Sequence, residues 1–221
     1  SQSLEREAGE GPDLTKIKAS YELYLAAKES LIGRIMDAVS SSSEAGLAMV
    51  SLLKILPLDL ALWPAAFLYE DEEDFRRGMS YIGAGDIELL RSDKESRVRY
   101  LALDGKQTVF TGTYSEDADY FLYTASYNGR DALYAECVKT YYGYAAQYYL
   151  LAGNGSAVYY LLSIEGEEGS IGFPVPQGFP EALTGGENPD FPKEAPEWFS
   201  IHEGVFTGMT VNGEELEFPL P

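Results

Sequence analysis

Four Asn-Gly or Asp-Gly pairs punctuate this 221-residue chain, and each lies between runs rich in Tyr, Val, Leu and Thr. The pairs are Asp104-Gly105, Asn128-Gly129, Asn154-Gly155 and Asn212-Gly213. Asn, Asp and Gly reach positive φ with the least strain, and a two-residue type I′ turn requires positive φ at both central positions. The pairs therefore predict antiparallel hairpins and constrain this chain more than any other feature.

The residues between these turns alternate with the period of two that is typical of strands. The predicted strands are 87–92, 97–104, 106–114, 119–127, 130–140, 144–152, 156–165 and a shorter one near 170–173, followed by a terminal hairpin of 205–211 and 214–218. Long strands joined by short turns predict an antiparallel meander.

Two-residue turns also predict a register. They pair Tyr123 with Tyr134 about Asn128-Gly129, and Tyr149 with Tyr160 about Asn154-Gly155. Both faces of the second hairpin are then apolar, and strands that are apolar on both faces are normally covered on both. The helices could cover one face, and the other needs the C-terminal stretch or a partner.

Before the strands, the apolar pattern has a helical period. From Asp13, a suitable N-cap, to about Ser40, one apolar stripe includes the stem of Lys28. Residues 45–69 then carry only Lys54 and Asp59 as charges and approach the length of a membrane span. The two prolines and the central charges favour a buried helix broken at Pro57 over membrane insertion.

The predicted fold class is α+β, with this N-terminal helical pair packed on a long-stranded, twisted antiparallel meander. Residues 1–12 are expected to be a flexible tether and 13–221 a single domain. Within it we expect a helical part at 13–85, the meander at 86–173, and at 174–221 an extended Pro- and Gly-rich wrap with the terminal hairpin.

Charge limits the partners of the chain. The sequence holds 36 acidic and 16 basic residues, a formal net charge of −20, which repels phosphate backbones and anionic head groups. We therefore expect no nucleic-acid partner. The polar opening without an initiator Met predicts an exported, extracytoplasmic bacterial protein, either secreted or held at the cell surface by a lipid anchor upstream of Ser1.

Residues for common catalytic and metal chemistry are scarce. His202 is the only histidine and Cys137 the only cysteine, which rules out an intramolecular disulfide and leaves one candidate base for a catalytic triad. Glu116, Asp117 and Asp119 cluster without the spacing of a calcium loop, so a solvated turn is favoured. We expect no catalytic residue, cofactor or metal.

Three functions stay open. The first is a non-catalytic protein that binds a protein or glycan through an aromatic-rich sheet face, although Tyr is also an ordinary strand residue. Its candidate surface is Tyr123, Tyr134, Tyr149, Tyr160 and Trp198. The second is a carrier of an apolar ligand or lipid in a cavity between sheet and helix, a layout similar to that of lipoprotein carriers. The third is a carbohydrate-active enzyme that uses a carboxylate pair.

Overall fold

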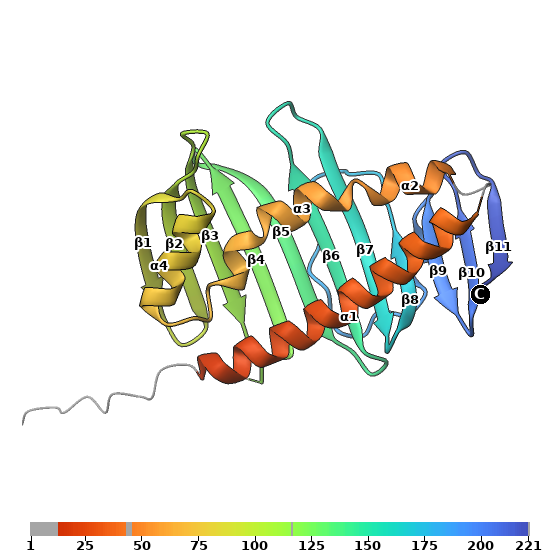
Figure 1. The fold of residues 1–221 in the computed structure, drawn as a ribbon, viewed down its shortest axis with the longest axis horizontal. Helices are drawn as coiled ribbons and strands as arrows, with labels where there is room; N and C mark the ends of the chain where they lie inside the picture. The colour runs from red at the N-terminus through yellow and green to blue at the C-terminus, as the bar shows by residue number, and fades with distance from the viewer. Residues whose placement is uncertain (1–12, 43–45, 116, 221) are drawn as a thin grey trace, which may run out of the picture.

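One antiparallel sheet of 11 strands, with helices across one of its faces, forms the protein (Figure 1). The computed structural model describes residues 13–42, 46–115 and 117–220. The strands lie in the order β1 to β11, so each hydrogen-bonds to its neighbours in sequence. The predicted helical region and antiparallel meander are confirmed, whereas the predicted tether lies outside the described residues.

Strand bounds follow the turn pattern closely. The strands are β1 (Gly85–Arg91), β2 (Glu95–Leu101), β3 (Gln107–Tyr114), β4 (Tyr120–Tyr127), β5 (Arg130–Lys139), β6 (Tyr144–Leu151), β7 (Ala157–Glu165), β8 (Glu168–Gly172), β9 (Trp198–His202), β10 (Val205–Met209) and β11 (Glu215–Pro219). The sequence pattern missed β9, a strand of five residues directly after the Pro-rich segment. This strand joins the terminal hairpin to the main sheet through pairs with β8 and β10.

The helices are α1 (Leu14–Ser41), α2 (Gly46–Leu52), α3 (Ile55–Ala61) and α4 (Glu72–Tyr81), with a 3-10 turn η1 (Trp63–Ala66) and a second, η2 (Phe191–Glu194). Asp13 caps α1, since its carboxylate accepts a hydrogen bond from Lys16 N at 3.1 Å. Figure 1 shows α1 running obliquely across the sheet, with α3 and α2 following a second line beside it. None of the helices that the structure describes is long and apolar enough to cross a membrane.

The break in the second helix lies at Leu53 and Lys54, before Pro57, which corrects the predicted position. Pro57 sits in the first turn of α3, where a missing N–H costs nothing because no helical partner exists there. Proline cannot donate to the Leu53 carbonyl, which accepts instead from Leu56 N at 3.3 Å. Pro57 therefore fits the first turn of α3, and its missing N–H interrupts the hydrogen bonds that would join α2 to α3.

Only one of the four turns has the predicted type. Asn128 and Gly129 have φ of 51° and 76°, as a type I′ turn requires. At the other three pairs only the glycine has positive φ. Hydrogen bonds such as Ala152 N to Ser156 O and Gly155 N to Ala152 O there define three-residue loops, each a type I turn followed by a glycine bulge.

These loops change the predicted register by one residue. Tyr149 pairs with Tyr159, and Tyr148 pairs with Tyr160. About Asn128-Gly129 a bulge beyond Ala125 pairs Tyr123 with Ala135. The predicted pairs Tyr123–Tyr134 and Tyr149–Tyr160 are therefore wrong, and in both cases the two side chains lie on opposite faces.

The core lies between the sheet and the helices, and it is rich in tyrosine. Tyr24 hydrogen-bonds to Tyr148, Tyr69 hydrogen-bonds to Tyr123, and Tyr148 stacks on Tyr160 with ring centroids 4.5 Å apart. Burial raises the pKa of these phenols well above 10. They are therefore neutral in the folded core at ordinary pH.

The opposite face of the sheet is covered at β5 and β6 by the segment between β8 and β9. Phe179 packs on Tyr149 at 4.8 Å between ring centroids, and Gln147 Nε2 donates to Glu181 O at 2.6 Å. The buried Glu136 carboxylate accepts from Leu183 N at 2.9 Å. Ring packing and hydrogen bonds thus attach this segment to the sheet.

Candidate functional site

A hollow of about 580 Å³ opens between the helices and the sheet near the β2–β3 turn. We call it the sheet-end hollow. The end of α3, η1 and the residue after α4 form one side, and β2, β3 and the end of β4 form the other. Its volume falls in the range of ligand pockets, about 300–1,000 Å³. Ala61 and Ala102, which have small side chains, are among the residues that line it.

Exposed apolar side chains surround the mouth of this hollow. Leu60 is 58% exposed, Trp63 52% and Leu103 84%. Leu103 packs against Gly83, because a β-carbon added to this glycine would lie 2.4 Å from the Leu103 side chain. Exposed apolar surface next to a hollow is typical of a binding site.

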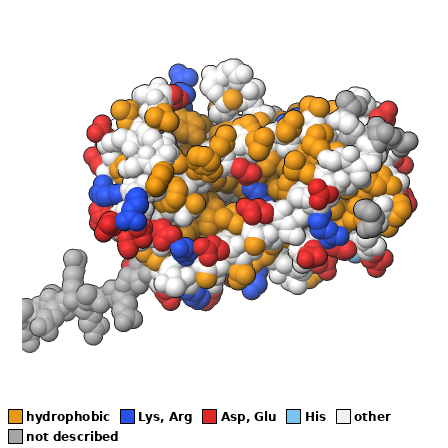
Figure 2. Space-filling model, in the orientation of Figure 1, with side chains coloured by type: hydrophobic (Ala, Val, Ile, Leu, Met, Phe, Trp, Pro, Cys, Tyr) orange, Lys and Arg blue, Asp and Glu red, His pale blue; other side chains and the backbone are white. Residues whose placement is uncertain are grey.

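The apolar surface continues along the helices. Val50, Leu53 and Leu56 are exposed as well, so the expectation of a buried second helix holds for one side only. Figure 2 shows hydrophobic side chains gathered on this face of the molecule. Leu60 and Trp63 belong both to this apolar surface and to the hollow, so the two are continuous.

Three hydroxyl side chains line the sheet side of the hollow. Tyr100, Thr108 and Tyr127 are register partners across β2, β3 and β4, so they form one row on the face toward the helices. Burial, with Tyr127 nearby, raises the pKa of Tyr100 to about 12. Burial also raises the pKa of Tyr127. Both phenols therefore stay protonated and can donate hydrogen bonds at neutral pH.

A second hollow, of about 370 Å³, lies between α1 and the α3–η1 segment, and we call it the inter-helix hollow. Lys28 and Asp59 line it with their charges paired, Nζ to Oδ1 at 2.6 Å. The Lys28 ammonium also lies 4.4 Å from the centroid of the Tyr148 ring. Lys28 is only 5% exposed, so its charge is buried and not merely its stem. Trp63 lines both hollows.

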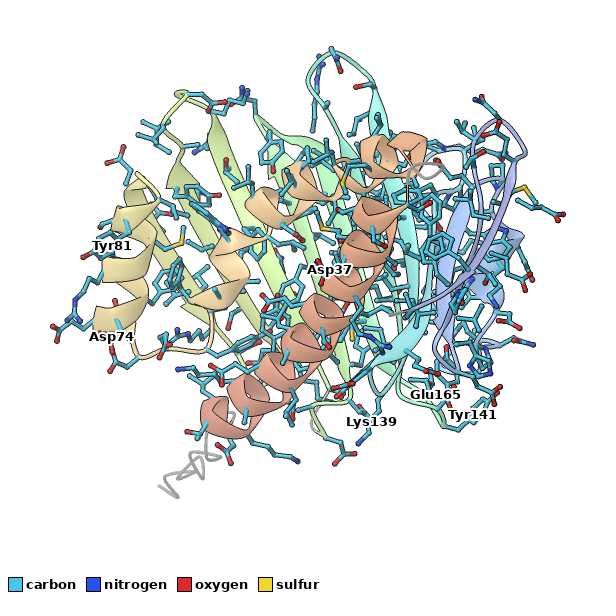
Figure 3. The ribbon with its side chains drawn as sticks, turned by 45° about the vertical axis from the view of Figure 1, so that its right-hand side comes forward. Asp37, Asp74, Tyr81, Lys139, Tyr141 and Glu165 are labelled. Atoms are coloured by element: carbon cyan, nitrogen blue, oxygen red, sulfur yellow. The ribbon has the colours of Figure 1, made fainter. Side chains whose placement is uncertain are left out.

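Figure 3 shows exposed side chains near the sheet-end hollow and at the opposite ends of the strands. Asp74 lies in the first turn of α4 and Tyr81 at its end, directly before Ile82 of the sheet-end hollow. Lys139, Tyr141 and Glu165 lie at the opposite ends of the strands, near the β5–β6 turn (Figure 3). The sheet-end hollow therefore lies at the strand ends that carry the β2–β3 turn, away from Lys139, Tyr141 and Glu165.

The residues considered for catalysis or metal binding do not form a centre in the part of the chain that the structure describes. His202 is exposed and its Nδ1 lies 3.4 Å from Glu168 Oε2. Cys137 is buried in β5, and burial raises the pKa of its thiol well above the ordinary value. Within residues 13–42, 46–115 and 117–220, no three His, Cys, Asp or Glu side chains are placed to hold a metal ion. Glu116, of the acidic turn, lies outside the described residues.

The five aromatic residues predicted as a binding surface are divided between the two faces. Tyr123 and Tyr160 are buried in the core beneath the helices, and Tyr149 is buried beneath Phe179. Tyr134 is partly exposed and donates to Glu136 Oε2 at 3.0 Å. Trp198 is also partly exposed, with the Lys193 ammonium 5.5 Å from its ring centroid. The structure does not bring these five rings together, and binding by any of them stays a prediction.

Leu60, Trp63, Leu103 and Thr108 are not among the site residues predicted from the sequence. One signal was present, because residues 45–69 are apolar in every direction around the helix. A helix in the outer layer buries only one side, so the other side of such a segment must remain exposed. Leu103 and Thr108 lie on either side of the β2–β3 turn, and no sequence pattern identifies them as site residues.

Comparison with protein-family models, curated proteins and solved structures found no match to this chain. Function is therefore inferred from the site itself.

Proposed function

We propose that the protein binds an apolar ligand, of the acyl-chain type, in the sheet-end hollow, and so acts as a carrier or binding protein. One observation carries the proposal: the 580 Å³ hollow lies between sheet and helix and is ringed by exposed Leu60, Trp63 and Leu103. A ligand there removes this apolar surface from water, which is favourable by about 25 cal/mol per Å².

The arrangement of the sheet supports this choice over binding through an aromatic sheet face. We take residues 174–196 to be the wrap expected from the sequence, since Phe179, Glu181 and Leu183 contact the face opposite the helices. Three of the five candidate aromatic side chains are buried. The helical face, with its continuous apolar surface, is then the side that offers area to a ligand.

A displacement experiment tests the proposal. Nile red, a neutral apolar dye, should gain emission on binding, and added 1-decanol should displace it. The Leu103→Asp variant should weaken both affinities about tenfold, because burying a leucine contributes about 1.5 kcal/mol or more. Leu103 is exposed, so the substitution should leave the fold intact.

The matched control is Val211→Asp, which places the same charge on another exposed apolar residue, near the β10–β11 turn. Its affinities should equal those of the unaltered protein. Absence of dye binding, or an equal loss in both variants, would rule out the hollow as the binding site.

A further inference from the structure

We infer that the ligand of the sheet-end hollow carries an uncharged hydrogen-bonding head group, such as a hydroxyl or carbonyl, which the row Tyr100, Thr108 and Tyr127 receives. This inference rests on the proposed function and specifies the chemical class of ligand. It excludes a fatty-acid anion and an alkylammonium ion as the preferred ligand.

Register places the three hydroxyl side chains side by side. Thr108 is the Cα partner of Tyr100 on one side and of Tyr127 on the other. Directly opposed residues of an antiparallel pair have β-carbons about 4.5–5.5 Å apart. All three line the hollow, whereas Leu60, Trp63 and Leu103 lie at its mouth. The hollow therefore has a row of hydroxyl groups on its sheet side and exposed apolar side chains at its mouth, beside the Asp104–Lys106 pair, which fits an amphipathic ligand that enters head first.

The Thr108 hydroxyl lacks the hydrogen bond that its burial requires. Thr108 is 1% exposed, and its Oγ1 has no hydrogen-bond partner in the described part of the chain. The Tyr100 phenol lies close enough to this hydroxyl to lower its own pKa against the effect of burial, but the contact falls short of hydrogen-bond geometry. Buried hydroxyls are normally paired, and a ligand polar atom that reached this one would supply the missing bond.

Charge in the lining argues for a neutral head group. Asp104 and Lys106 are the charged residues that line the hollow, and they pair with each other on the exposed β2–β3 turn. Tyr100 and Tyr127 remain protonated because burial raises both pKa values. An ionised head group would lose hydration beside this row of hydroxyl groups without gaining an opposite charge, which is unfavourable.

The test compares three ligands with one chain and different heads: 1-decanol, decanoate and decylammonium, each displacing Nile red at pH 8. We expect 1-decanol to bind at least about tenfold more tightly than either ion. Thr108→Val keeps the shape and removes the hydroxyl, so it should weaken 1-decanol about fivefold, the value of one hydrogen bond, and leave the ions unchanged.

Thr111→Val is the matched control, because Thr111 lies on the same strand with its side chain on the opposite face. Thermal melting should show Thr108→Val at least as stable as the unaltered protein, since it removes an unpaired buried hydroxyl. Equal affinities for the three ligands, with no effect of Thr108→Val, would overturn the inference and leave the proposed function standing. Preference for decanoate that Lys106→Gln abolishes would also overturn it. If none of the three displaces the dye, the proposed function itself fails.

Discussion

At the scale of single residues, Lys28 is the least ordinary side chain of the protein. Its ammonium is buried between α1 and the sheet, paired with Asp59 and placed over the Tyr148 ring. The two partners are unequally buried, since the side chains of Lys28 and Asp59 are 6% and 43% exposed. The helical pattern predicted the inward side of α1, but a pattern of apolar positions could not show that the charge itself is buried.

This inequality predicts an asymmetric response to mutation. Asp59→Ala should lower the free energy of unfolding by about 3 kcal/mol, because it leaves a buried ammonium without its counter-ion. Lys28→Met should change it by less than about 1 kcal/mol, because Asp59 stays hydrated and methionine fills the apolar site. Urea unfolding of both variants measures the difference, and equal losses or the reverse order would contradict it.

At the scale of elements, the turns decide which face each tyrosine occupies. The Asn-Gly and Asp-Gly pairs located the hairpins correctly, since β2 to β7 and the terminal hairpin lie where the pattern predicts. They did not fix the turn type, because the same dipeptide suits a two-residue loop and a three-residue loop. The choice depends on strand pairing beyond the turn, and the one-residue difference moved Tyr160 to the face opposite Tyr149.

The two turn types predict different costs for the same substitution. Asn128 has φ of 51° and its Oδ1 accepts from Gln107 N at 3.0 Å, so Asn128→Ala should cost about 1–2 kcal/mol of stability. Asn212 has no positive φ, so Asn212→Ala should cost less than about 0.5 kcal/mol. Thermal melts of the two variants provide the comparison. A cost for Asn212→Ala that matches Asn128→Ala would show that the turns do not differ as described.

At the scale of the whole molecule, the tyrosine core predicts a loss of stability in alkali. Tyr24, Tyr69, Tyr123, Tyr148 and Tyr160 have pKa values raised well above 10 in the folded state. Above pH 10 the unfolded chain releases protons that the folded chain retains. The free energy of unfolding has its full value below pH 10 and falls as the pH rises further. The loss is about 1.4 kcal/mol per pH unit for each phenol, or about 7 kcal/mol per pH unit for the five together.

Urea unfolding at pH 9, 10 and 11, with tyrosinate absorbance recorded in parallel, measures this loss. The five phenols should ionise together as the protein unfolds. Ionisation of all the tyrosines while the protein stays folded would contradict the description of the core.

The whole molecule also shows where sequence reasoning ends. Alternating residues and turns predicted the meander, and the apolar segment at 45–69 predicted a helix against the sheet. The sheet-end hollow depends on the path of α3 and η1 across the strands. Pro57 and the contacts of the core together determine this path. No local pattern records that path, so the sequence offered a cavity between sheet and helix only as an alternative.

The emission of Trp63 tests the central claim most directly. Trp198→Phe leaves Trp63 as the only tryptophan of the chain, at the mouth of the sheet-end hollow. Addition of 1-decanol should shift its emission to shorter wavelength and saturate at one equivalent, because the bound chain removes water from the indole. Emission that stays unchanged through saturating 1-decanol would contradict the assignment of this hollow as the ligand site.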